Sequence, residues 1–172
     1  MSPWTVLAQG ISSKTDLSIG MATFLISIFI LIFWVPLKQI PGIGTILNAI
    51  IIASAIDLTL GFIPKPELIY LKILQASFGI LIVGIGSGIY LASNLGPGPR
   101  DGLMIGLQQK TNTSIPLIRT IIEITAVTVG WFLGGIVGIG TILFVFGIGP
   151  CVGVGLTLVE KVSKKRINKL EK

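Results

Sequence analysis

The feature that most constrains this chain is a series of apolar runs, each long enough to cross the hydrocarbon core of a bilayer. A helix needs roughly 20 apolar residues for that crossing, and a longer run can tilt. Only 12% of the residues are charged, whereas about a quarter are charged in a typical globular protein. The sequence therefore predicts an all-α, polytopic integral membrane helix bundle in contact with the lipid bilayer. The expected spans are residues 17–37, 43–63, 68–95, 115–133 and 137–159.

The positive charge is concentrated at the C-terminal end of the chain. The net charge is +6, and six of the thirteen Lys and Arg residues lie within residues 161–172. In a soluble domain this excess would suggest nucleic acid, but beside membrane spans it indicates a basic cytoplasmic tail under the positive-inside rule. We therefore expect residues 160–172 to form that tail, the N-terminus to lie outside, and nucleic acid not to be a partner.

One segment of the sequence cannot continue a helix. Residues 94–102 contain three glycines and two prolines; proline lacks the N–H and glycine favours non-helical φ values. A break at the end of a span frees backbone N–H and C=O groups, which are tolerated only where protein or trapped water satisfies them. Residues 100–109 are too few to cross and are expected to form a short interfacial or re-entrant helix. The broken-helix residues are Asn94, Gly96, Pro97, Gly98, Pro99 and Gly102.

The chain also repeats itself at an offset of 96 positions. The Gly-Ile-Gly-Thr-Ile-Leu run at residues 42–47 recurs at 138–143, and Pro3 aligns with Pro99 without a gap. Chance coincidence of apolar residues does not produce such a run in register, so we expect an internal duplication. Three crossings per unit would make the copies point in opposite directions, as in many transporters. The expected repeats are residues 1–67 and 68–159, with structural turns at Gly44, Thr45, Gly140 and Thr141.

The first copy has no counterpart of the span that precedes the break. Residues 68–95 precede Pro99, whereas only two residues precede Pro3. We therefore expect that about thirty further residues, enough for one span, precede this chain in the natural protein or its nearest relatives. That addition would give six spans with both termini inside. An in-frame stop codon immediately upstream of Met1 would contradict this expectation.

With these features, the chain resembles the YczE/YyaS/YitT-like group of bacterial integral membrane proteins, and its YczE-like branch most of all. The resemblance rests on Leu95–Leu103, on the pair formed by Arg119 and Glu123, and on Leu133–Thr141. It covers essentially the whole chain, which differs from the pattern in lacking the first span. The resemblance implies a helix bundle in the bacterial cell (inner) membrane. It implies little about activity, because the group is largely uncharacterised biochemically.

Charged residues that occur in only one copy of the repeat are the functional candidates, because a charge within the membrane is costly unless it is paired or faces water. Arg119 and Glu123 are four residues apart on one span, so they share a face. They either line a solute site or join Asp101 in an ion-pair clamp that holds the broken backbone. Arg100 faces either an anionic solute or lipid phosphate, and Asp101 lines the site or caps the short helix. Asp57 is either a proton or cation relay or a solvated residue near the outer interface.

Two functions are compatible with this pattern. The first is a small secondary transporter or permease for a small solute, with an anion as the first candidate. The alternative is a non-transporting membrane factor that binds or supports a protein or lipid partner; self-association into a homo-oligomer is a further candidate. We expect no enzymatic activity, metal site or cofactor. The chain has no histidine and a single cysteine, Cys151, and it lacks a nucleophile–base pair and a cofactor fingerprint.

Overall fold

The computed structural model describes the backbone of residues 1–63 and 66–170, and the side chains of that part apart from residues 115–116 and 164–170. All regular secondary structure in this part of the chain is helical, with no strand, so the predicted all-α fold is confirmed for it. The basic segment 160–172 continues the last helix as far as Leu170, and its side chains beyond residue 163 lie outside the described residues. The helices are α1 (Pro3–Ser12), α2 (Ile19–Trp34), α3 (Ile43–Leu60), α4 (Ile69–Ala92), α5 (Pro99–Thr111), α6 (Ile115–Phe132) and α7 (Ile139–Leu170).

Local sequence signals explain where these helices begin. The side chains of Ser2 and Ser18 accept hydrogen bonds from the first-turn N–H groups of α1 and α2, as N-cap residues do. Proline occupies the first turn of α1 and α5, where its missing N–H costs nothing. Three helix pairs begin 96 residues apart: α1 and α5, α2 and α6, and α3 and α7.

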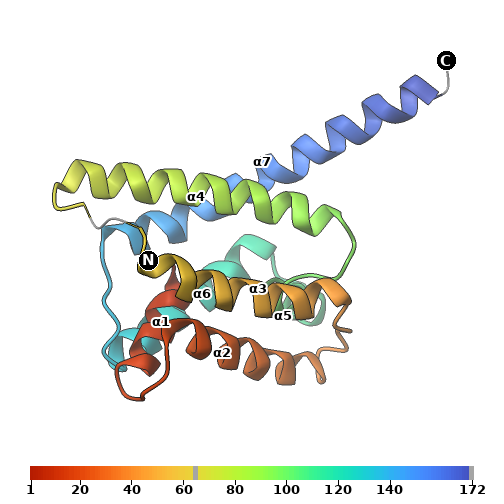
Figure 1. Cartoon of the computed structure of the whole chain (residues 1–172). Coiled ribbons are helices and arrows are strands. Elements are labelled where there is room, and N and C mark those ends of the chain that lie inside the picture. Colours follow the sequence, from red (N-terminus) through yellow and green to blue (C-terminus); the bar gives the residue numbers. More distant parts are fainter. Residues whose placement is uncertain (64–65, 171–172) are drawn as a thin grey trace.

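Helices α4 and α7 pack side by side and form one layer of the molecule (Figure 1). Glycines permit this close approach. A side chain at Gly84 would collide with Cys151, and one at Gly88 would collide with Val152 and Gly155. Among the described residues, α4 packs along its length against α7, and its Tyr90 side chain lies beside Gly44 of α3. The α4–α7 pair therefore packs mainly within itself, and α7 also contacts α6 and α1.

The other five helices form a second body. Helix α1 packs against α6 and α2, and α2 packs against α3 and α5. Trp34 at the end of α2 is buried, and its indole N–H donates a 3.0 Å hydrogen bond to the carbonyl oxygen of Pro99. Gly102 lies against the Trp34 ring and leaves no space for a side chain. The core of this body consists of Trp4, Ala8, Ala22, Ile26, Ile30, Trp34 and Ala126.

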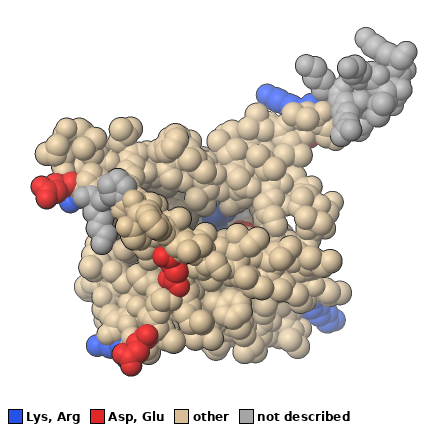
Figure 2. All heavy atoms as spheres, in the orientation of Figure 1, with Lys and Arg blue, Asp and Glu red and all other residues tan. Residues whose placement is uncertain are grey.

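The face of the molecule shown in Figure 2 carries few charged residues, and many large apolar side chains of the described part are exposed. Large apolar side chains such as Phe29 and Phe62 are exposed to the surroundings. Among the described helices, α3, α4 and residues Ile139–Ser163 of α7 are long and apolar enough to cross a membrane, and α2 is apolar but shorter. The exposed surface and these helices are typical of a multi-pass membrane protein, because lipid solvates apolar side chains. Five crossings remain a prediction.

Candidate functional site

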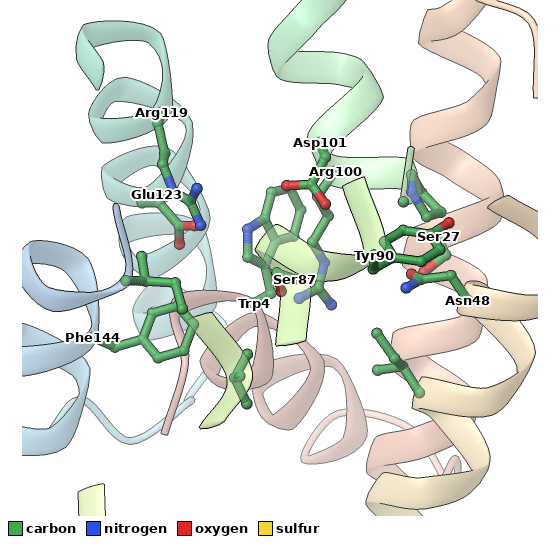
Figure 3. Close-up of a pocket in the computed structure, with 15 residues that line it drawn as sticks. Trp4, Ser27, Asn48, Ser87, Tyr90, Arg100, Asp101, Arg119, Glu123 and Phe144 are labelled. Atoms are coloured by element: carbon green, nitrogen blue, oxygen red, sulfur yellow. The ribbon is translucent and has the colours of Figure 1, made fainter. Parts of the chain in front are cut away.

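A polar cavity of about 120 Å³ lies between the α4–α7 pair and the five-helix body. In Figure 2 the hollow between the two bodies exposes blue and red atoms, although the surface around it is tan and therefore without Lys, Arg, Asp or Glu. The four charged candidates of α5 and α6 all line it, so the structure brings together residues from two different helices (Figure 3). The cavity is lined by Arg100, Asp101, Arg119 and Glu123, by the polar residues Ser27, Asn48, Ser87 and Tyr90, and by apolar residues that include Trp4, Val83, Phe144 and Ile148.

Helix α5 supplies Arg100 and Asp101 from its first turn, directly after the break. The Arg100 guanidinium carbon lies 4.8 Å from the centre of the Trp4 ring, in cation–π geometry. Burial lowers the pKa of Arg100 to about 10, although the nearby Glu123 and Asp101 carboxylates act in the opposite direction. Burial also raises the pKa of Asp101 above its ordinary value, and the two arginines counteract this only in part. Both groups are therefore held in a poorly hydrated environment.

Helix α6 supplies Arg119 and Glu123, which lie one turn apart. Glu123 is 6% exposed, which makes it a buried carboxylate. The Nε atom of Arg119 and the Oε2 atom of Glu123 are buried and have no hydrogen-bond partner. Buried polar atoms of folded proteins nearly always have partners, so an unpartnered pair needs an explanation. A polar group or water in the cavity would supply the missing donor and acceptor.

The break between α4 and α5 is held by three hydrogen bonds to its carbonyl oxygens. The Tyr90 hydroxyl donates to the Gly96 carbonyl at 2.6 Å, and the Thr45 hydroxyl donates to the Pro97 carbonyl at 2.7 Å. The backbone N–H of Gly44 donates to the Leu95 carbonyl at 2.9 Å. Gly96 has φ of +102°, a conformation that favours glycine. The chain therefore leaves α4 and enters α5 along a path that is fixed by the start of α3.

The predicted turn residues lie where α3 and α7 begin. The Thr45 hydroxyl accepts a 3.1 Å hydrogen bond from the Gly42 N–H, and the Thr141 hydroxyl accepts a longer one, 3.5 Å, from the Gly138 N–H. Both threonines are fully buried. Thr45 also contacts the break, as described above, so its role extends beyond its own helix.

Asp57 lies outside the cavity. Its carboxylate accepts hydrogen bonds from the Ser18 hydroxyl at 2.5 Å and from the Gly20 backbone N–H at 2.7 Å, both at the start of α2. A carboxylate at this position satisfies a free helix N–H and complements the helix dipole. The structure thus places Asp57 in a contact between α3 and α2 rather than with the other charged candidates.

Sequence analysis missed several residues of the cavity. Asn48 and Ser87 are isolated polar residues in otherwise apolar spans, a signal that could have identified them. Trp4 lies outside the expected spans, and nothing local indicated that Arg100 would stack on it. In the part of the chain that is described, no three His, Cys, Asp or Glu residues form a group able to hold a metal ion.

Comparison with known proteins identifies relatives of this chain. Residues 1–156 match the model of a family of unknown function, DUF6198. An uncharacterized protein of Haemophilus influenzae is 41% identical over 161 residues, which cover 94% of this chain and 74% of that protein. The uncharacterized membrane protein YczE of Bacillus subtilis is 31% identical over 144 residues, 83% of this chain and 67% of YczE. The uncharacterized protein YyaS of the same species is 31% identical over 173 residues, 96% of this chain and 85% of YyaS. No solved structure matches.

Proposed function

The chain belongs to the DUF6198 family and is a relative of the membrane protein YczE and of YyaS, and from this premise we propose that it is a small secondary transporter or permease. Its substrate is a small solute that carries an anionic group. The observation that supports this most is the cavity between the two helix bodies, in which the buried Arg119 Nε and Glu123 Oε2 atoms lack partners. Charged residues inside a membrane bundle are costly, and their retention is typical of a solute or ion pathway.

The division into two bodies favours transport over simple binding. The α4–α7 pair packs internally through glycines, and Val83, Ser87 and Phe144 of this pair form one wall of the cavity. Rocking of one rigid body against another around a fixed site is the usual mechanism of secondary transporters. We propose that the α4–α7 pair moves as such a unit and opens the cavity to alternate sides of the membrane.

We also propose that the chain is an inverted duplication, with its site at the interface between the copies. Three helix pairs begin 96 residues apart. Lys38 and Gly134, separated by the same offset, both have positive φ, and Thr45 and Thr141 make the same type of turn contact. Residues of both copies line the cavity, Asn48 from the first and Arg119 from the second. This arrangement corresponds to the midplane site of repeat-built transporters.

The protein functions in the bacterial inner membrane with its C-terminus in the cytoplasm, and it carries out no covalent chemistry. The alternative function is a membrane factor that binds a protein or lipid partner. One observation favours that alternative: Arg100 lies over Trp4 and thereby joins α5 to α1, as expected if the charges form an internal clamp.

A thermal-shift screen of the purified protein in detergent tests the proposal. Small anions, amino acids and metabolites are added one at a time across a range of pH, because a ligand of the native state raises its apparent stability. We expect specific stabilisation that is lost in Arg100→Ala and in Glu123→Gln. Lys110→Gln is the matched control, since Lys110 is exposed at the end of α5. Stabilisation by no compound, together with co-purification of a lipid or protein partner, would instead support the membrane factor.

A further inference from the structure

The cavity combines both signs of charge in equal number, and from this we infer that the solute is a small zwitterion whose cationic and anionic groups are separated by one or two carbon atoms, as in a small amino acid. The inference rests on the proposed function, since it names the class of solute that the cavity takes. It is carried by charge balance, by the two unpartnered atoms of α6 and by the size of the cavity.

The charges of the cavity cancel. Two guanidinium groups, Arg100 and Arg119, are opposed by two carboxylates, Asp101 and Glu123. An anion would add an uncompensated negative charge to a poorly hydrated space, and a cation would add an uncompensated positive charge; either is costly. A zwitterion adds none. The balanced set of wall charges therefore favours a solute that is itself neutral overall but charged at both ends.

The two unpartnered atoms require different hydrogen-bonding groups on the solute. Arg119 Nε is a hydrogen-bond donor and needs an acceptor, whereas Glu123 Oε2 is an acceptor and needs a donor. Residues four apart on a helix are neighbours, with about 5–6 Å between their Cβ atoms. One small solute can therefore reach both, with its carboxylate on Arg119 and its ammonium on Glu123. A simple anion satisfies Arg119 Nε, but it leaves Glu123 Oε2 without a donor and repels the Glu123 carboxylate.

The size of the cavity restricts the solute further. A volume of about 120 Å³ is several times the roughly 10–15 Å³ that one water molecule requires. Phe144, Ile148 and Val83 close the side toward the α4–α7 pair with apolar groups. The cavity therefore has room for a compact solute.

Three pairs of matched compounds test the inference by titration calorimetry on the whole chain in detergent. Each pair joins a zwitterion to the hydroxy acid that carries a hydroxyl in place of the ammonium: glycine and glycolate, L-alanine and L-lactate, and β-alanine and 3-hydroxypropionate. At least one zwitterion is expected to bind about tenfold or more tightly than its partner, because it alone supplies a charged donor to Glu123.

Variants then locate the selectivity. Glu123→Gln is expected to weaken binding of the zwitterion and to improve binding of the hydroxy acid, so that the preference is lost. Glu67→Gln is the matched control, because Glu67 is exposed just before α4 and does not line the cavity. Asp101→Asn serves the same purpose if Glu123→Gln does not fold. The comparison of each zwitterion with its hydroxy acid on the unmodified chain requires no variant.

The outcomes separate the inference from the proposed function. Preference for a zwitterion that disappears in Glu123→Gln supports both. Equal or tighter binding of a hydroxy acid overturns the zwitterion and leaves the solute site in place. Binding of none of the six compounds overturns the zwitterion, and the broader thermal-shift screen then decides independently whether the cavity takes a solute at all.

Discussion

The hydroxyl group of Tyr90, in the last turn of α4, donates a 2.6 Å hydrogen bond to the carbonyl oxygen of Gly96, in the break that follows that helix. The contact closes a loop of a few residues and orients the backbone that leads to Arg100. Tyr90 also lines the cavity. The residue thus connects the helix that bounds the site to the segment that presents its charges.

Replacing Tyr90 by Phe should destabilise the protein. The part-buried Gly96 carbonyl would lose its donor, and loss of one such hydrogen bond costs about 0.5–1.5 kcal/mol. The free energy of unfolding in detergent, measured by denaturant titration, gives the value. Tyr70→Phe is the control, because Tyr70 is exposed on the same helix. Equal stability of the two variants would show that the Tyr90 contact does not hold the break.

Thr45→Val should be more disruptive than the same change elsewhere on α3. The two side chains have nearly the same shape, but valine neither donates to the Pro97 carbonyl nor accepts from the Gly42 N–H. We expect a loss of about 1–3 kcal/mol in the free energy of unfolding. Thr59→Val removes a hydroxyl that bonds within its own helix and should change stability by less than about 0.5 kcal/mol, as is usual for surface substitutions. A loss as large at Thr59 would contradict the assignment.

The α4–α7 interface predicts a difference between two glycines of α4. Gly84→Ala inserts a methyl group where Cys151 already lies, and such overpacking costs about 1–3 kcal/mol. Gly86→Ala meets open space and should be neutral or stabilising by up to about 1 kcal/mol, because alanine favours a helix over glycine. Thermal unfolding of both variants in the same detergent measures the difference. Similar midpoints would mean that the helices do not pack as described.

Glu123→Gln distinguishes a solute-binding carboxylate from a structural clamp. If Glu123 serves the solute, the variant should fold normally and lose the stabilisation that solute provides. If it is a clamp, Arg119 loses its neighbouring charge, and breaking a buried pair costs about 3–5 kcal/mol. The free energy of unfolding, measured without and with solute, separates these outcomes. Normal stability together with unchanged solute binding would reject both roles.

Asp101 predicts how stability depends on pH. Burial raises the pKa of this carboxyl in the folded protein above its ordinary value of 3.8, so the folded state keeps a proton that the unfolded state releases. This bound proton stabilises the folded state fully at pH values below the pKa of Asp101 in the unfolded chain. The stabilisation is lost as pH rises through the pKa of Asp101 in the folded protein. The free energy of unfolding should therefore decline from about pH 4 upward as Asp101 ionises, and Asp101→Asn should remove this part of the decline. Asp16→Asn, an exposed control, should keep it. An unchanged pH profile in Asp101→Asn would contradict this.

Much of the secondary structure followed from local sequence signals. The apolar run expected at 43–63 is α3 (Ile43–Leu60), and the short helix expected at 100–109 is α5 (Pro99–Thr111). The helix pairs begin at the offset of 96 residues found in the sequence. Such features depend on hydropathy, on the missing N–H of proline and on capping side chains, all of which act within a few residues. The last span was expected over residues 137–159, and helix α7 (Ile139–Leu170) continues beyond it into the basic segment, which contains no glycine or proline.

The sequence by itself determined that this chain is a membrane helix bundle, where its helix breaks, and which charged residues lie in apolar surroundings. Only the tertiary structure decided which of those residues meet. Arg100 and Glu123 share a cavity with Trp4, whereas Asp57, equally conspicuous in the sequence, is bound by Ser18 and Gly20 at the start of α2. Hydropathy and backbone preference are local properties, so they place a residue on a helix. The partners of its side chain depend on how distant helices pack, and for Asp57 those partners lie almost forty residues away.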